Sequence, residues 1–359
     1  MTVKGPSGRA DQKGVSGALR TRPADPSEPG IRAVLSRNLP DAATPERISW
    51  LYGSNPCGPA LVWLAETEGS GEPVATSAAH RRTFRIDGRE ALALNLSDFA
   101  IDAGYRTLGP ALGLLRATLA AVAEGGFAMS YDVPSESMLA LYKRLGYVEL
   151  GRMERRVRPL SLGPALRRRI GGIACVVAPA LDLCLRVRDA LASTPGDVRV
   201  APLEGAFGAE FDALEAREAT RHRVRGARTA AYLDWRYARH TMWKHGVLSA
   251  RRGGALVGFA VWREAGSAFG IAELVDGGDL GVARALVKGL AAVGRRRGAT
   301  ALSVETLAGS PASERFESLG FLRRGDGPGP VVYVPPGSAL PADAVAARHW
   351  WFLGGDRDI

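Results

Sequence analysis

The chain has 359 residues, of which 46% are hydrophobic, and this is more than a single typical domain needs for its core. With 44 glycines, 22 prolines and only three cysteines, the composition excludes a collagen-like chain, a disulfide scaffold and a globally disordered protein. The formal net charge of +10 indicates anionic partners, either a phosphate-rich small molecule, a nucleic acid or an anionic membrane surface. The basic patches have no interleaved aromatic residues, so nucleic acid is not the expected partner.

The chain divides by composition into five parts. Residues 1–30 are polar, rich in glycine and proline, and lack the apolar stretch of a signal peptide, so we expect a disordered tail and a cytoplasmic protein. An α/β unit over 31–158, an apolar helical connector over 159–196 and a second α/β unit over 197–335 follow, with a C-terminal extension over 336–359.

The first unit is predicted to be a strand meander followed by helix, strand, helix and strand. The expected elements are strands at 31–35, 60–66, 74–84, 89–101 and 127–133, and helices at 45–52, 110–125 and 135–145. The second unit repeats this order in outline, with strands at 247–251, 255–263, 269–275 and 301–306 and helices at 281–297 and 311–319. Leu145-Gly-Tyr147 and Leu319-Gly-Phe321 are matching landmarks, which favours an internal duplication.

The most informative segment runs from Leu96 to Leu112, where a strand passes through a tight turn into a helix. Backbone N–H groups at a helix start, together with the helix dipole, form a cradle for a pyrophosphate. Gly109 and Ala111 keep side-chain bulk away from this cradle, and Arg106 adds a positive charge suited to phosphate oxygens. The alternative interpretation is an ordinary strand-to-helix connection with a solvent-exposed arginine.

Arg106, Gly109 and Ala111 stand at the spacing of the acyl-CoA-binding signature of the GNAT superfamily, which this segment resembles. Leu141 to Tyr147, about thirty residues later, resembles the family's closing helix and strand. The resemblance implies an α/β fold of two GNAT-like domains, each a mixed, mostly antiparallel sheet flanked by helices. It also implies acetyl-CoA, or another acyl-CoA, as co-substrate, and it assigns its binding to Phe99, Ala100, Ile101, Arg106, Thr107, Leu108, Gly109, Ala111 and Leu112.

Two side chains are candidates for the chemistry. Tyr142 occupies the position where many GNAT enzymes carry the acid that protonates the leaving thiolate, and its alternative role is packing beneath the last strand. Asp98 is a candidate base, and its alternative is a solvated carboxylate at a sheet edge. Ser135 stands where family members often carry asparagine, which leaves the acceptor contacts there open.

The second unit departs from the signature. Gly278 replaces the arginine, Asp279 would repel a phosphate, and Phe316 stands where the first unit has Tyr142. We therefore expect a degenerate copy that forms a wall of the acceptor pocket or an interface. Tyr232 to Tyr237 and Trp350 to Asp358 resemble segments of tandem-GNAT and Fem-like bacterial proteins, which suggests an amino sugar or a cell-envelope precursor as the amine acceptor.

The prediction is therefore an N-acyltransferase that acts on a small-molecule amine. The alternatives are an inactive GNAT-like scaffold and a Fem-type aminoacyl transferase. Residues 163–192 are expected to form a buried inter-domain helix or, alternatively, a shallow attachment to the inner membrane surface, since Arg167 to Arg169 precede the apolar stretch Ile170 to Leu185. The histidines lack metal-ligand spacing, so no metal is expected. The sequence leaves the oligomeric state open.

Overall fold

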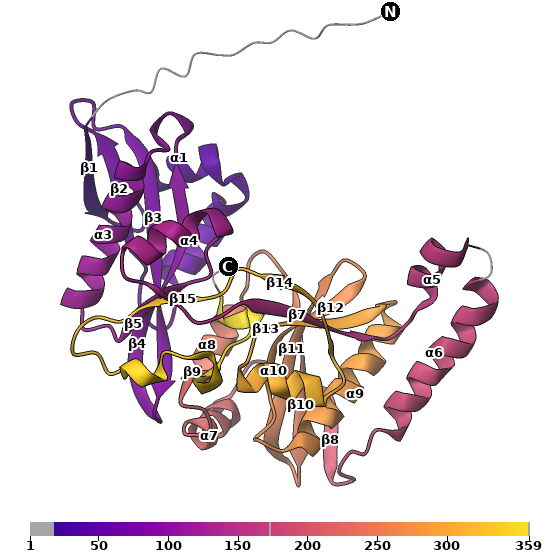
Figure 1. Cartoon of the computed structure of the whole chain (residues 1–359). Coiled ribbons are helices and arrows are strands. Elements are labelled where there is room, and N and C mark those ends of the chain that lie inside the picture. The colour runs from indigo at the N-terminus through magenta and orange to yellow at the C-terminus, as the bar shows by residue number, and fades with distance from the viewer. Residues whose placement is uncertain (1–17, 172–173, 358–359) are drawn as a thin grey trace, which may run out of the picture.

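The computed structural model describes residues 18–171 and 174–357, which form two mixed β-sheets flanked by helices (Figure 1). This arrangement confirms the predicted fold class. The first sheet is built mainly from the first half of the chain and the second sheet mainly from the second half.

The first sheet has the order β1-β2-β3-β4-β5-β15-β6, with β9 paired to β3 and β16 paired to β9. Its strands are β1 (Leu19–Ala24), β2 (Leu61–Thr67), β3 (Pro73–Ile86), β4 (Arg89–Ile101), β5 (Met129–Asp132), β6 (Val148–Glu149), β9 (Val224–Gly226), β15 (Val331–Tyr333) and β16 (Trp350–Trp351). The prediction of a disordered tail over 1–30 is wrong for its last part, because β1 pairs with β2 along its whole length. Residues 1–17 lie outside the described part of the chain.

The helices around the first sheet position the candidate site. They are α1 (Pro29–Asn38), α2 (Pro45–Ile48), the π-helical turn η2 (Ser49–Gly53), α3 (Leu108–Glu124) and α4 (Glu136–Arg144), with the short turns η1 (Pro40–Ala42) and η3 (Ala103–Tyr105). The strand expected at 31–35 is wrong. Ile31, Val34 and Leu35 are buried at helical spacing behind a proline at the helix start, so α1 forms instead.

The second sheet has the order β14-β7-β13-β12-β11-β10-β8. Its strands are β7 (Met153–Pro159), β8 (Val198–Pro202), β10 (His245–Arg252), β11 (Ala255–Ala265), β12 (Ala268–Val275), β13 (Ala301–Leu307) and β14 (Leu322–Gly327). The helices and turns of this half are α7 (Ala209–Glu218), α8 (Ala230–Leu233), the π-helical turn η5 (Asp234–Ala238), α9 (Leu280–Arg296), α10 (Pro311–Ser318), η6 (Ala342–Ala344), η7 (Ala347–His349) and η8 (Gly354–Asp356).

The two sheets exchange strands. β7, at the end of the first unit, inserts between β13 and β14 of the second sheet. β15, from the end of the second unit, inserts between β5 and β6 of the first sheet. Residues 153–158, expected in the first unit, therefore lie in the second sheet, and residues 331–333, expected in the second unit, lie in the first sheet.

The connector forms a helical hairpin of α5 (Gly163–Ile170) and α6 (Ala174–Leu191) at the outer edge of the second half (Figure 1). The expectation of a buried inter-domain helix is wrong, because Leu183, Val187 and Leu191 are exposed on α6. Asp189 anchors the helix to the body through ion pairs with Arg158 and Arg295. Attachment of this segment to a membrane surface stays a prediction.

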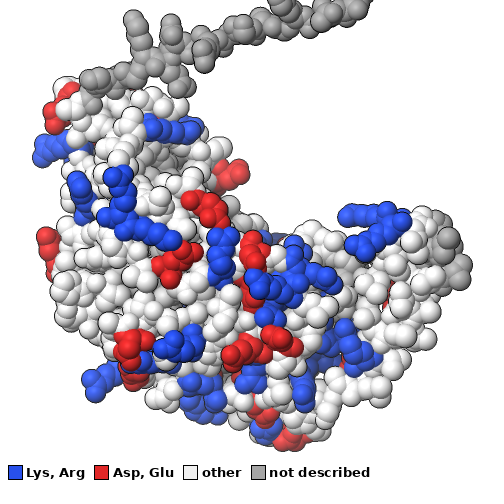
Figure 2. All heavy atoms as spheres, viewed as in Figure 1, with Lys and Arg blue, Asp and Glu red and all other residues white. Residues whose placement is uncertain are grey.

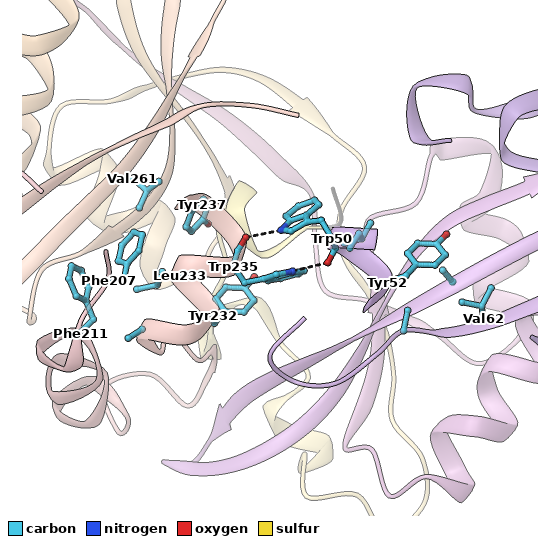
Figure 3. Close-up of a cluster of buried hydrophobic side chains, with 14 of the residues drawn as sticks. Trp50, Tyr52, Val62, Phe207, Phe211, Tyr232, Leu233, Trp235, Tyr237 and Val261 are labelled. Atoms are coloured by element: carbon cyan, nitrogen blue, oxygen red, sulfur yellow. Dashed lines mark hydrogen bonds between the residues drawn. The ribbon is translucent and has the colours of Figure 1, made fainter. Parts of the chain in front are cut away.

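One hydrophobic core spans the junction of the two halves. Trp50 and Tyr52 of η2 and Val62 of β2 belong to the same buried cluster as Trp235 of η5 and Val261 of β11 (Figure 3). The rings of Trp50 and Trp235 stack with 5.3 Å between their centroids. A shared core of this kind holds the two sheets in a fixed relation, since separating them would expose it to water.

Candidate functional site

A cleft of about 270 Å³ opens in the first sheet between β4, the end of β5 and α4. Its walls include Ser97, Asp98 and Phe99 from β4, Asp132 from β5, and Met138 and Tyr142 from α4. We call it the β4–β5 cleft.

The cleft exists because β4 and β5 separate. Their parallel pairing ends at Asn95 and Tyr131, and beyond this point no further pair joins the two strands. On its other side β4 stays paired with β3, but the register shifts, so that Asp98 and Phe99 lie opposite a single residue, Ser77. Asp98 has a φ of 50°, a conformation that side chains rarely adopt outside such bulges. The bulge turns β4 away from β5 and leaves main-chain groups facing the cleft.

Tyr142 points its hydroxyl group into the region where the cleft ends. The residue is 2% exposed and its hydroxyl donates a hydrogen bond to Asp132 Oδ2. Its ring packs edge-on against Tyr147 at 4.8 Å. The packing interpretation of Tyr142 and its catalytic interpretation are therefore compatible, because the ring is buried while the hydroxyl group lines the cleft.

Asp98 forms a buried ion pair. Both of its carboxylate oxygens accept from the guanidinium of Arg47, at 2.8 and 2.9 Å, and Oδ2 also accepts from the hydroxyl of Tyr52 at 2.8 Å. The interpretation of Asp98 as a solvated edge carboxylate is wrong, since it is 9% exposed. Because both carboxylate oxygens are already occupied by Arg47 and Tyr52, this geometry favours a positioning role over proton abstraction.

A second polar pair at the same site was not predicted from the sequence. His80 of β3 lies 2.6 Å from the Ser97 hydroxyl, measured from its Nε2 atom, and both residues are buried. Burial lowers the pKa of His80 to about 4, so the ring is neutral at pH 7. Only the pairing of β3 with β4 brings these two residues together across 17 positions of sequence. Asp132 was not among the predicted site residues, although an acid at the end of a short buried strand is a recognisable signal.

The start of α3 is open, as the predicted cradle requires. Thr107 precedes the helix without a side-chain cap, and the first N–H groups, those of Leu108 and Gly109, have no partner within an α-helix. A Cβ atom on Gly109 would meet nothing within 4 Å, so the space above this turn is open. Pro110 contributes no N–H group. The residues present thus fit a pyrophosphate held by two backbone donors and a helix dipole.

Arg106 lies beside this turn and is exposed. Its Nε donates to the Ile101 carbonyl at 2.9 Å and its Nη2 to Asn38 Oδ1 at 3.0 Å. Asn38 also donates to Asp102, which accepts from Arg37. This network fixes the end of α1 against the turn and directs the arginine beside the cradle.

The other residues assigned to acyl-CoA binding divide by position. Phe99 lines the β4–β5 cleft, whereas Ala100 and Ile101 are buried and pair with β3. Leu108 is 48% exposed, and Ala111 and Leu112 belong to the side of α3 that packs on the sheet. Their roles in binding stay predictions.

In the second unit, the corresponding helix start is capped by an aspartate side chain. Asp279 caps α9, and its Oδ1 accepts from the N–H groups of Gly281 and Val282. Its Oδ2 accepts from Arg252. A carboxylate therefore occupies the position that a phosphate would need. Phe316 is fully buried against Phe321.

Within residues 18–171 and 174–357, no three histidine, cysteine or acidic side chains lie close enough together to bind a metal ion. Over the same residues, no helix is long and apolar enough to cross a membrane.

The fold is similar to solved acyltransferase structures. A probable N-acyltransferase from Enterococcus faecalis superposes with a TM-score of 0.64 at 12% identity, covering 88% of this chain and 72% of that one. A GCN5-related N-acetyltransferase from Anabaena variabilis gives 0.63 at 12% identity, with coverages of 88% and 73%. A GCN5-related N-acetyltransferase from Kribbella flavida gives 0.56 at 16% identity, with coverages of 89% and 72%. No protein-family model and no curated protein matches the sequence.

Proposed function

We propose that the chain is an N-acyltransferase that transfers an acyl group, acetyl in the simplest case, from acyl-CoA to an amine. The observation that carries this proposal is the β4–β5 cleft, which a bulged strand and the buried side chain of Tyr142 line together with Leu115 of α3, the helix whose start is open. The similarity of the fold to N-acetyltransferases supports the same general class.

Different elements of the chain would bind the different parts of acyl-CoA. The N–H groups of Leu108 and Gly109 would hold the pyrophosphate, with Arg106 beside it. The unpaired edge of β4 next to Phe99 would receive the pantetheine arm, which places the thioester between Ser97 and Tyr142. When bound, acyl-CoA supplies an activated carbonyl carbon.

Transfer requires one proton to leave the amine and one to reach the thiolate. The amine nitrogen forms a bond to the carbonyl carbon, and the carbon–sulfur bond breaks. Tyr142 donates its hydroxyl proton to the departing sulfur and is reprotonated from solvent. Ser97 relays the amine proton to the neutral ring of His80, which lies at hydrogen-bonding distance. The ring then releases this proton to solvent, because burial holds its pKa at about 4, and the proton that solvent returns to Tyr142 closes the balance. Asp98 and Arg47 hold the bulge that shapes this site.

The proposal identifies the acceptor substrate only as an amine. The suggestion of an amino sugar or a cell-envelope precursor as acceptor depends on sequence resemblance alone. The turn at Asp279, which the aspartate side chain caps, supports the proposal that the second unit does not bind acyl-CoA. A scaffold without turnover and a Fem-type transferase are the alternatives.

Binding of acetyl-CoA, followed by calorimetry, tests the donor site. Gly109→Asp places a carboxylate in the cradle at a helix start, where acids stabilise the helix, so it should abolish binding without loss of stability. Gly104→Asp is the matched control, because this glycine of η3 is also surrounded by open space. Equal binding by both variants and the parent would refute the cradle.

Release of free CoA thiol with a panel of amines tests turnover. Release that depends on an amine supports the transferase, and binding without release across the panel would favour the scaffold. Retention of charged tRNA at physiological salt, without acetyl-CoA binding, would favour the Fem-type alternative.

A further inference from the structure

A second and larger cleft, of about 580 Å³, lies on the second sheet, outside the site described above. Its walls come from η5, the segment that follows it, the β11–β12 hairpin, β7, β13 and η8. The cleft falls within the volume range of small-molecule sites. We call it the arginine cleft.

Strand alternation explains which face of the sheet it occupies. Leu302 of β13 is buried in the core with α9, whereas Ser303 and Glu305 line the cleft on the opposite face. The neighbouring strand contributes Gly270 and Ala272. The floor is therefore made of small residues, which leaves room above the sheet.

The walls are strongly basic. Arg155, Arg236, Arg263 and Arg357 line the cleft, and Glu305 is the one acidic residue of the lining. Glu305 forms an ion pair with Arg357 at 2.9 Å. Three arginines therefore face the cleft without a carboxylate to balance them, within the described part of the chain.

Arg236 is the most informative of the three. It is 8% exposed, and its Nη2 donates to the main-chain carbonyls of Gly355 and Arg357, at 3.3 and 3.0 Å. Buried charges are ordinarily paired, because removing an ion from water is costly. Arg228, nearby in sequence, follows this rule through Glu273 and Asp356. Arg236 has no such carboxylate partner among the described residues, and only main-chain carbonyl oxygens accept hydrogen bonds from its guanidinium group.

Two histidines report the same positive potential. Burial lowers the pKa of His240 to about 3 and that of His245 to about 4, and in both cases Arg236 and Arg263 lower it further. His240 Nδ1 accepts hydrogen bonds from the N–H groups of Met242 and Trp243. The neutral ring therefore carries its proton on Nε2 and is a hydrogen-bond donor.

We propose that the arginine cleft binds a phosphate monoester of a small molecule, with the phosphate held by Arg155, Arg236 and Arg263. Arginine presents paired N–H donors that match phosphate oxygens, and a dianion would neutralise most of the uncompensated charge. Arg263 is preorganised for this role, because its guanidinium lies 4.4 Å from the centroid of the Trp243 ring. Figure 2 shows basic and acidic side chains interspersed over much of the viewed face, whereas the lining of the arginine cleft holds four arginines and one glutamate.

The test is calorimetry with glucose 6-phosphate, inorganic phosphate and glucose at low ionic strength. All variants carry Gly109→Asp, so that the cradle of α3 is blocked and any phosphate binding reports the arginine cleft alone. We expect both phosphates to bind and glucose not to bind. Arg155→Gln with Arg263→Gln should weaken the binding at least ~tenfold, since two charge-assisted contacts are lost.

The control removes the same charge elsewhere. Arg116→Gln with Arg199→Gln changes two exposed arginines on α3 and β8, outside the cleft, and should leave binding within about twofold. Absence of phosphate binding, or equal weakening by both double variants, would overturn the proposal. The outcome is independent of acyl transfer, because neither turnover nor acetyl-CoA enters the measurement.

Discussion

Trp50 and Trp235 donate hydrogen bonds to each other's main chain across the junction of the two sheets. Nε1 of Trp50 lies 2.9 Å from the Trp235 carbonyl oxygen, and Nε1 of Trp235 lies 3.0 Å from that of Trp50 (Figure 3). Both residues belong to π-helical turns that follow a short helix capped by a threonine, Thr44 or Thr229. The reciprocal contact makes the two halves meet through equivalent surfaces.

Trp50→Ala should lower the free energy of unfolding by about 3–5 kcal/mol, because it removes a 5% exposed aromatic side chain and leaves a cavity. Trp50→Phe keeps most of the packing but leaves the Trp235 carbonyl without its donor, at a cost of about 1–3 kcal/mol. Urea unfolding followed by circular dichroism measures both. A loss below 1 kcal/mol for the alanine variant would mean that this contact does not hold the junction.

The exchange of β7 and β15 predicts that the first unit cannot fold alone. A fragment of residues 18–160 lacks β15, so β5 and β6 lose the strand that joins them, and β7 has no sheet to enter. We expect this fragment to unfold without a cooperative transition, whereas residues 18–357 unfold cooperatively. A stable fragment with a sharp thermal transition would contradict the importance of the exchange.

The C-terminal segment is part of the core. Asp356 is 1% exposed and forms ion pairs with Arg228 and Arg82. Asp356→Ala leaves both arginines without this partner, so we expect a loss of about 3–5 kcal/mol of unfolding free energy. Asp343→Ala is the matched control, since this carboxylate is exposed and pairs with Arg223 on the surface. Similar unfolding midpoints for the two variants would disprove the structural role.

Acid should destabilise the protein through its buried histidines. Burial lowers the pKa of His80 from 6.5 to about 4 in the folded state, so the unfolded chain binds the proton more tightly. The contribution of His80 to the free energy of unfolding is therefore fully present above pH 6.5 and is lost as the pH falls from 6.5 toward 4. His80→Gln, which retains a polar group near Ser97, should reduce this slope in melting temperature against pH. An unchanged slope would show that His80 already titrates normally.

Tyr142→Phe tests the proposed acid. We expect kcat to fall by about a hundredfold while the affinity for acetyl-CoA is retained, because the ring keeps its packing and the variant loses only the hydroxyl group with its hydrogen bond to Asp132. Tyr147→Phe is a matched control in the same aromatic pair, and its hydroxyl group contacts Ser130 rather than the cleft. Equal activity of the two variants would exclude Tyr142 as the proton donor.

Local patterns in the sequence determined much of the fold around the site. The strand over 89–101 and the helices over 110–125 and 135–145 agree with β4, α3 and α4, because hydrophobic periodicity and glycine stops act over a few residues. The resemblance to the acyl-CoA-binding signature, and not periodicity, indicated the turn at Arg106 to Ala111 and the position of Tyr142. The cap at Asp279 also follows from local chemistry, since an aspartate before a helix accepts from its first N–H groups.

The tertiary structure alone decided the contacts between distant segments. The pair of His80 with Ser97, the locking of Asp98 by Arg47, the exchange of β7 and β15, and the arginine cleft each join residues that no local period relates. β15 is three residues long, too short to produce a pattern, and it forms because two strand edges need partners. Pairing, burial and charge balance are properties of the folded chain, because they depend on which surfaces meet in space.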